Sequence, residues 1–228
     1  MTTRILVCCL AAWLAAGCGG DLSVTVEVET GDPVVPGATD PPYSSSATFP
    51  SGLKVSLIRD AALTGGYPAP AQNPFGGVRQ RHYAQVGYFI DLPRAPLSQL
   101  LAANFRLSEF VSSVRQRGES RAYVDPQLVH HVQEIRSGLG RPLILNSGFR
   151  SPEHNRAVGG ATFSRHIYGD AVDIDVDQSR PDANQLAQEV FNEAQDVKVD
   201  FVLPLTETTV SVGGSARVSW VHIDDRGF

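Results

Sequence analysis

The stretch that decides the fold, residues 164–175, has the sequence SRHIYGDAVDID. In its second half, apolar and acidic residues alternate, so a strand would place Asp173 and Asp175 together on one face. His166 precedes this strand by one turn that contains a glycine. An imidazole beside a row of carboxylates is a set of ligands that suits a divalent ion such as zinc. Taken alone, the stretch equally fits a half-exposed strand whose acids meet water, so both interpretations stay open at this point.

A second candidate ligand lies in the sequence SWVHID, residues 219–224. A catalytic zinc site normally uses three protein ligands and leaves a further position open to water. His222 is the best candidate for the third ligand. A lone histidine in an apolar strand would otherwise be a core residue whose ring nitrogens find hydrogen-bond partners inside the protein.

Calcium is the other metal that this region suggests, and a calcium-stabilised adhesive surface protein is the function that would follow. Asp173, Asp175 and Asp177 alternate as acids do at the start of an EF-hand loop. The sixth position of such a loop is Gln178 here instead of glycine, and the twelfth is Asn184 instead of glutamate. The calcium hypothesis therefore fails these two tests.

Hydrophobic spacing around these motifs predicts an α+β domain from about residue 101 onward, with helices first and an antiparallel meander last. Capping residues and apolar faces predict helices that begin at Ser108, at Asp125 and near Asp182. The predicted strands of this domain cover residues 142–146, 199–203, 208–212 and 217–223.

The N-terminal 17 residues have the pattern of a signal peptide. One cation, Arg4, precedes an apolar run that is too short to cross a bilayer as a helix of about 20 residues. Small residues then lead to Cys18, as in the lipobox of bacterial lipoproteins. We expect lipidation of Cys18, because loss of Cys8 and Cys9 with the signal otherwise leaves one unpaired thiol. An ordinary secretory signal with a free Cys18 is the alternative.

Between the signal and the C-terminal domain, the sequence predicts two segments. Residues 18–50 are expected to be a tether, because residues 31–50 contain five prolines, two glycines and five serines or threonines. Residues 51–100 are expected to be a β-rich extension of unknown role, with strands near residues 53–58 and 86–90.

Composition sets the remaining limits on function. The chain has 228 residues, of which 42% are hydrophobic and 19% charged, which excludes a disordered protein. The formal net charge is −5, and loss of Arg4 with the signal makes it one unit more negative. A mildly acidic chain is a poor candidate for binding nucleic acid, and no nucleic-acid partner is expected. The sequence does not indicate an oligomeric state.

Three separated motifs, in this order, resemble a known family. They are SGFRSP (residues 147–152) with Asn155 and the glycine pair at 159–160, the pattern Ser-x-His-x-x-Gly-x-Ala-x-Asp (residues 164–173), and WVHID (residues 220–224). Together they resemble the zinc D-alanyl-D-alanine carboxypeptidases and endopeptidases that cut peptidoglycan cross-links, whose fold is shared with the Hedgehog signalling domain. The resemblance covers residues 104–224. It implies an α+β fold with helices packed on a small antiparallel sheet, and a zinc peptidase-like domain over residues 101–228.

The resemblance also implies roles for single residues. His166, Asp173 and His222 correspond to zinc ligands, with one zinc ion per chain. Arg150 corresponds to the cation that docks a substrate carboxylate or a polarised carbonyl, a role that suits its planar fork. Ser164 would support the site through a hydrogen bond.

One position departs from the family pattern. Many members carry an acid three residues before the last histidine as general base, and Ser219 stands there in this chain. A serine hydroxyl cannot accept a proton at neutral pH as a carboxylate does. Asp224 is the candidate substitute because it shares a strand face with His222, and Asp175 is a weaker one. His154 is interpreted as a loop contact, and the pair at 130–131 as histidines on a helix surface.

The sequence thus predicts a zinc-dependent peptidase that cuts amide bonds in the peptide stems or cross-links of peptidoglycan. It would be exported to the bacterial cell envelope and held on a membrane through the lipid at Cys18. The alternative is a catalytically inactive, zinc-containing module that binds peptidoglycan or a protein, as the missing acid at Ser219 allows.

Overall fold

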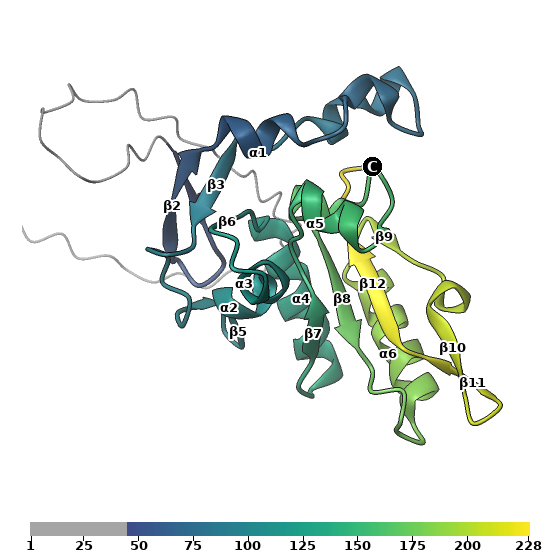
Figure 1. Cartoon of the computed structure of the whole chain (residues 1–228). Coiled ribbons are helices and arrows are strands. Elements are labelled where there is room, and N and C mark those ends of the chain that lie inside the picture. Colours follow the sequence, from purple (N-terminus) through teal and green to yellow (C-terminus); the bar gives the residue numbers. More distant parts are fainter. Residues whose placement is uncertain (1–44) are drawn as a thin grey trace, which may run out of the picture.

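In the computed structural model of the chain, a four-stranded antiparallel sheet (Figure 1) carries two of the three predicted metal ligands, Asp173 and His222. The strands lie in the order β7-β8-β12-β9. Their bounds are Ile144–Ser147 for β7, Ala171–Asp175 for β8, Phe201–Val202 for β9 and Trp220–Asp224 for β12. The predicted strand with alternating acids is therefore β8, and it lies in the interior of the sheet.

The structure describes residues 45–228. The predicted signal peptide (residues 1–17), the predicted lipidation site Cys18 and most of the predicted tether lie outside the described residues. Within residues 45–228, no helix combines the length and the hydrophobicity that crossing a membrane requires.

Two long helices cover one face of this sheet (Figure 1). They are α4 (Pro126–Leu139) and α6 (Ala183–Asp196), which pack on each other, and α6 also contacts β9 and β12. The predicted start of α4 is confirmed, since the Asp125 side chain accepts a hydrogen bond from the backbone N–H of Gln127. Gly140 ends α4 in the left-handed conformation, with φ of 61°.

The two faces of the sheet differ in chemistry. Val172, Ile174, Val221 and Ile223 are buried in the hydrophobic core. Successive side chains of a strand point to opposite faces, so the residues between these four, Asp173 and His222, project from the other face.

The extension forms a second four-stranded antiparallel sheet with the order β1-β2-β3-β6. Its strands are β1 (Ser45–Thr48), β2 (Lys54–Arg59), β3 (Tyr88–Asp91) and β6 (Arg121–Ala122). The last residues of the predicted tether are therefore a strand, which is a correction. Composition alone missed it because β1 is formed by pairing with β2 and by burial of Ala47 and Phe49.

Short elements connect the two sheets. Between β2 and β3 lie α1 (Ala61–Gly65), η1 (Pro70–Gln72) and η2 (Gly77–Tyr83). The others are β4 (Leu100–Ala102), β5 (Phe105–Arg106), α2 (Leu107–Phe110), α3 (Ser112–Gln116), α5 (Pro152–Ala157), η3 (Arg165–Tyr168), η4 (Leu205–Thr208), β10 (Thr209–Val212) and β11 (Ser215–Val218).

Three predictions of local structure are wrong in detail. The expected C-terminal meander is absent from the described chain, because β9 pairs with β12 while β10 and β11 form a separate hairpin. The strand predicted at residues 217–223 is interrupted at Ser219 and divides into β11 and β12. The N–H of Ser219 donates to the carbonyl oxygen of Thr208.

The helix that was predicted to begin at Ser108 begins one residue earlier, at Leu107. The Glu109 carboxylate accepts a hydrogen bond from the backbone N–H of Arg106 just before this helix.

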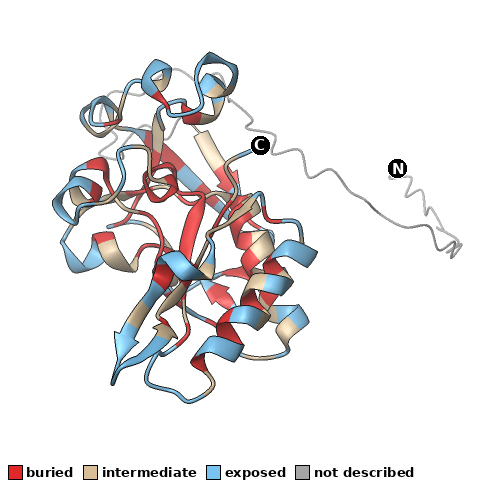
Figure 2. Cartoon of the chain, turned by 90° about the vertical axis from the view of Figure 1, so that its right-hand side faces the viewer, coloured by how far each residue is buried: buried red, intermediate tan, exposed pale blue. Residues whose placement is uncertain are grey.

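One continuous cluster of buried apolar side chains links the two sheets. Figure 2 marks the buried residues of the chain in red. It contains Phe89 and Ile90 of β3 together with Leu128 of α4 and Ile174 of β8. In addition, β3 of the extension pairs with β6, which follows residue 101 in the chain. The extension and the C-terminal region therefore share one core, and the extension is fixed relative to the predicted metal ligands.

Candidate metal centre

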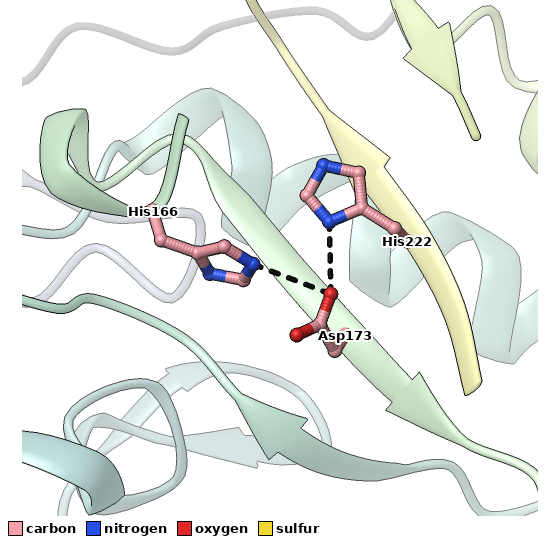
Figure 3. A group of neighbouring side chains, drawn as sticks. All are labelled: His166, Asp173 and His222. Carbon is pink, nitrogen blue, oxygen red and sulfur yellow. Dashed lines mark hydrogen bonds and ion pairs between the residues drawn. The ribbon is translucent and has the colours of Figure 1, made fainter. Parts of the chain in front are cut away.

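The structure brings together the three residues that the sequence suggested as metal ligands. His166 lies on η3, Asp173 in β8 and His222 in β12 (Figure 3). One ligand atom from each lies within 4.8 Å of the others. In the β8–β12 register, His222 lies directly opposite Asp173, and η3 places the buried His166 beside this pair. The antiparallel register therefore builds the group from residues 49 positions apart in the chain.

The partners of His166 define which of its nitrogens can bind a metal. Nδ1 lies 2.8 Å from the carbonyl oxygen of Gly148, which can only accept, so Nδ1 carries the proton. In the neutral ring, Nε2 then presents a lone pair to Oδ1 of Asp173, 3.2 Å away. Burial lowers the pKa of His166, which favours this neutral form.

His222 is held in a comparable way. Its Nε2 lies 3.2 Å from Oδ2 of Asp224, and its Nδ1 lies 2.8 Å from the same Oδ1 of Asp173. Burial lowers the pKa of His222, but hydrogen bonds to Asp173 and Asp224 raise it to about 9. Without a metal, a proton on His222 therefore balances the charge of Asp173. A neutral His222 with its proton towards Asp224 presents the Nδ1 lone pair to Asp173.

These contacts test whether the residues fit zinc. With both imidazoles neutral, two nitrogen lone pairs and one carboxylate oxygen converge, and acceptors at such distances repel one another unless a cation lies between them. Two imidazole nitrogens and a carboxylate oxygen are ligand types that zinc takes, and three of them leave a position open. The group of His166, Asp173 and His222 therefore fits zinc.

Arg150 contacts the second oxygen of the same carboxylate. Its Nη2 donates to Oδ2 of Asp173 at 2.9 Å, and its Nε donates to Oγ of Ser147 at 2.9 Å. Its remaining nitrogen, Nη1, has no hydrogen-bond partner among residues 45–228. Arg150 thus orients Asp173 and keeps free N–H groups beside the metal ligands.

Asp224 is fully buried behind His222. Its Oδ1 accepts from Nε of Arg226 at 2.6 Å, and its Oδ2 accepts from Nη2 of Arg226 at 2.5 Å as well as contacting His222. Burial raises the pKa of Asp224, but the hydrogen bonds from Arg226 and His222 outweigh burial and lower it. Asp224 therefore faces the nitrogen of His222 that points away from Asp173.

The remaining sequence candidates lie outside this group. The Ser164 hydroxyl makes no hydrogen bond within the described part of the chain, so the supporting bond expected from it is not found. Asp175 accepts the N–H of Asp177 in the turn after β8. His154 lies on α5. His131 is not a surface residue as predicted, because its Nδ1 lies 2.8 Å from Oδ1 of Asp225 and its side chain is 12% exposed.

Sequence reasoning missed a buried ion pair beside His166. Nε of Arg165 donates to Oδ1 of Asp170 at 3.0 Å, while Nη1 donates to the carbonyl oxygen of His82 at 2.7 Å. A second hydrogen bond joins Arg165 to Asp170. Both side chains are 7% exposed. Arg165 therefore links η3 to the extension, and no spacing rule indicates a partner 83 residues away.

Gly148 is a further residue whose role emerges only in three dimensions. A Cβ atom at this position would overlap the carbonyl group of Phe110, which accepts the N–H of Phe149. Only glycine therefore lets α2 pack this closely against residue 148, whose own carbonyl oxygen accepts the hydrogen bond from Nδ1 of His166. The signal was present in the sequence, since Gly148 belongs to the first motif.

The α+β fold and the converging His-Asp-His group are features of a zinc hydrolase domain. Residues 103–202 match the model of the Peptidase M15 family. A zinc D-Ala-D-Ala carboxypeptidase from Streptomyces albus G is 48% identical over 44 residues, which cover 19% of this chain and 17% of that protein. The family recognised from the motifs and the predicted α+β class are confirmed.

The family match ends before β12 and so includes His166 and Asp173 but not His222. The third member of the group is thus identified by the β8–β12 pairing and by its contact with Asp173, which Figure 3 draws.

Proposed function

We propose that this chain is a zinc-dependent peptidase that hydrolyses amide bonds in the peptide stems or cross-links of peptidoglycan. The observation that carries the proposal is the convergence of His166 Nε2, His222 Nδ1 and Asp173 Oδ1 within a Peptidase M15 fold. Release of stem-peptide fragments from purified peptidoglycan, abolished by a chelator and restored by zinc, tests it. A protein that binds no zinc and releases nothing would contradict it.

The chain's own residues prepare this site in three ways. Gly148 fixes the tautomer of His166, Arg150 fixes the orientation of Asp173, and Asp224 fixes His222. When bound, zinc supplies polarisation of a carbonyl group and activation of water. The free Nη1 of Arg150 is placed to donate to a carboxylate or carbonyl oxygen of the substrate.

In this proposal Asp224 is a positioning residue instead of the substitute base. Its two oxygens bind Arg226 and His222, and it has no exposed surface from which to reach a substrate. A carboxylate that receives the second N–H of a ligating histidine holds the ring in place and raises its basicity.

The substitution Asp224→Asn is therefore expected to weaken zinc binding by roughly 10- to 100-fold, because loss of such a partner typically has this effect. Competition with a chromogenic chelator measures the zinc dissociation constant. Asp225→Asn is the matched control, since the neighbouring Asp225, whose side chain is 4% exposed, contacts His131 and not His222. Unchanged zinc affinity, together with loss of activity and of the acidic limb of the pH profile, would instead assign Asp224 the role of base.

A catalytically inactive zinc-containing module that binds peptidoglycan or a protein is the second candidate. The observation in its favour is Ser219, which stands where many relatives have an acid and whose N–H binds the carbonyl of Thr208. Zinc bound at full occupancy without turnover of any stem peptide would support this module over the peptidase.

The proposed location rests on the N-terminal sequence. We propose that residues 1–17 are a signal peptide, that Cys18 is lipidated and that the chain acts in the bacterial cell envelope, with peptidoglycan as partner. Cys18→Ser is expected to move most of the protein from the membrane fraction to the soluble fraction, because one unlipidated tether has no membrane affinity of its own. Fractionation of the expressing cells, with Cys9→Ser as control, checks this. An unchanged membrane fraction in Cys18→Ser would contradict the anchor.

A further inference from the structure

A cavity of about 360 Å³ lies next to the candidate metal centre. Its lining includes Phe75, Tyr83 and Phe163 as aromatic walls and Arg165, Asp224 and Arg226 as charged groups. Asp224 is shared with the metal centre, because it contacts Nε2 of His222. One side chain, the fully buried Asp224, therefore separates the cavity from His222.

One wall of this cavity comes from the extension. Phe75 and Tyr83 belong to the segment 70–83, which precedes the family match at residues 103–202. The other walls come from the loop before η3 and from the residues around β12. The cavity is therefore a feature of this chain that the matched Peptidase M15 region alone does not form.

The segment 70–83 is firmly attached to the element that carries His166. The ring of Tyr83 packs edge-on against Phe163 and Tyr168, with centroid distances of 5.4 and 5.8 Å. The guanidinium of Arg165 lies 5.1 Å from the Tyr83 ring and donates to the carbonyl of His82. Because these contacts fix the wall to η3, the cavity has a defined position relative to the metal ligands.

The cavity offers both apolar surface and a hydrogen-bond donor. Phe75 stacks on Tyr83 at 6.3 Å and meets Phe228 edge-on at 5.0 Å between ring centroids, and its exposed fraction of 44% leaves part of its surface open to a ligand. Arg165 is occupied by Asp170 and His82. Arg226 uses Nε and Nη2 for Asp224, and its Nη1 has no hydrogen-bond partner among the residues that the structure describes.

The lining charges indicate which ligand fits. Two guanidinium groups and one carboxylate line the cavity, and the carboxylate is already satisfied by Arg226. A guanidinium N–H next to aromatic walls suits a short apolar group that carries a carboxylate. The peptide stems of the proposed substrate contain amino-acid residues of this kind, with free carboxylates.

We propose that this cavity is a substrate subsite that binds a carboxylate-bearing residue of the stem peptide, and that the extension thereby sets substrate selection. The inference rests on the proposed function, because it takes the stem peptide as the ligand. It gives the extension a role in binding, in which Phe75, packed on the buried Tyr83, holds one residue of the peptide while the neighbouring amide lies at the metal centre.

Phe75→Ala tests the subsite. We expect KM for a synthetic stem peptide to rise roughly tenfold, with kcat within about twofold and zinc content unchanged, because the ring contributes binding and no chemistry. Val78→Ala is the matched control, since Val78 lies on the same segment, is 92% exposed and does not line the cavity. For the native chain, amidation of one of the stem carboxylates is expected to raise KM by a similar factor.

Binding measured by calorimetry separates the failure of this inference from the failure of the proposed function. If the zinc-loaded protein turns over no peptide but Phe75→Ala weakens stem-peptide binding tenfold, the subsite stands and the peptidase does not. If the native chain hydrolyses the peptide and Phe75→Ala matches it in KM and Kd, the subsite is wrong. No binding and no turnover of any stem peptide would overturn both.

Discussion

His166→Ala is expected to abolish zinc binding and to reduce peptidase activity by at least about 10³-fold. Zinc contributes several kcal/mol of transition-state stabilisation, and each 1.4 kcal/mol corresponds to about a factor of ten in rate. His166 is 3% exposed, and its backbone carbonyl, which the substitution keeps, accepts the N–H of Arg150. Metal analysis of the purified variant and an assay on stem peptides measure both effects.

Arg150→Ala is the informative comparison for this experiment. Arg150 contacts Asp173 but is not itself a ligand, so the variant is expected to keep most of its zinc and to lose substrate use. Zinc loss in His166→Ala and zinc retention in Arg150→Ala, with activity low in both, would separate metal binding from substrate binding. Full activity in a zinc-free His166→Ala protein would falsify the proposed mechanism.

Arg165→Met is expected to lower the free energy of unfolding by about 3–5 kcal/mol, because it leaves the charge of Asp170 buried without a partner. The same substitution removes the hydrogen bond to His82 that ties η3 to the extension. Urea unfolding measures the change. Arg156→Met, at an exposed position on α5, is the control and is expected to change stability by less than about 0.5 kcal/mol.

The decrease in the free energy of unfolding that Arg165→Met causes should depend on pH. Burial raises the pKa of Asp170 to about 7 against the opposing effect of Arg165, and removal of Arg165 raises it further. An acid whose pKa is raised by folding loses stability as pH rises from its unfolded to its folded pKa, so the variant continues to lose stability above pH 7. The difference in free energy of unfolding between the native chain and the Arg165→Met variant should therefore be larger at pH 8.5 than at pH 5.5. A loss below 1 kcal/mol at both pH values would contradict the structural role of the pair.

The motifs pointed to the three residues of the candidate metal group because each of them has a local signal. Alternation along β8 places Asp173 on the face opposite Val172 and Ile174, and the same parity applies to His222 in β12. The start of α4 at Asp125 was also predictable from a local signal. The capping aspartate and the first turn of the helix are neighbours in sequence.

The features that the sequence did not reveal depend on contacts between distant residues. The pairing of β9 with β12, the bond from Arg165 to His82 and the sharing of one core by the two sheets have no local pattern. The hydrogen bonds of Asp224 are a further example, because strand alternation places this residue on the face of His222 but only the packing of Arg226 shows that both of its oxygens accept hydrogen bonds.

The most direct test of the central claim is to measure zinc content and stem-peptide release in one sample of the soluble chain from residue 45 onward. The described residues share one core, and this fragment contains that core in full. The account predicts about one zinc ion per chain and release of stem-peptide fragments from purified peptidoglycan that a chelator stops and added zinc restores. Stoichiometric zinc without any released product, from either cross-linked or uncross-linked stems, would contradict the peptidase and favour the binding module.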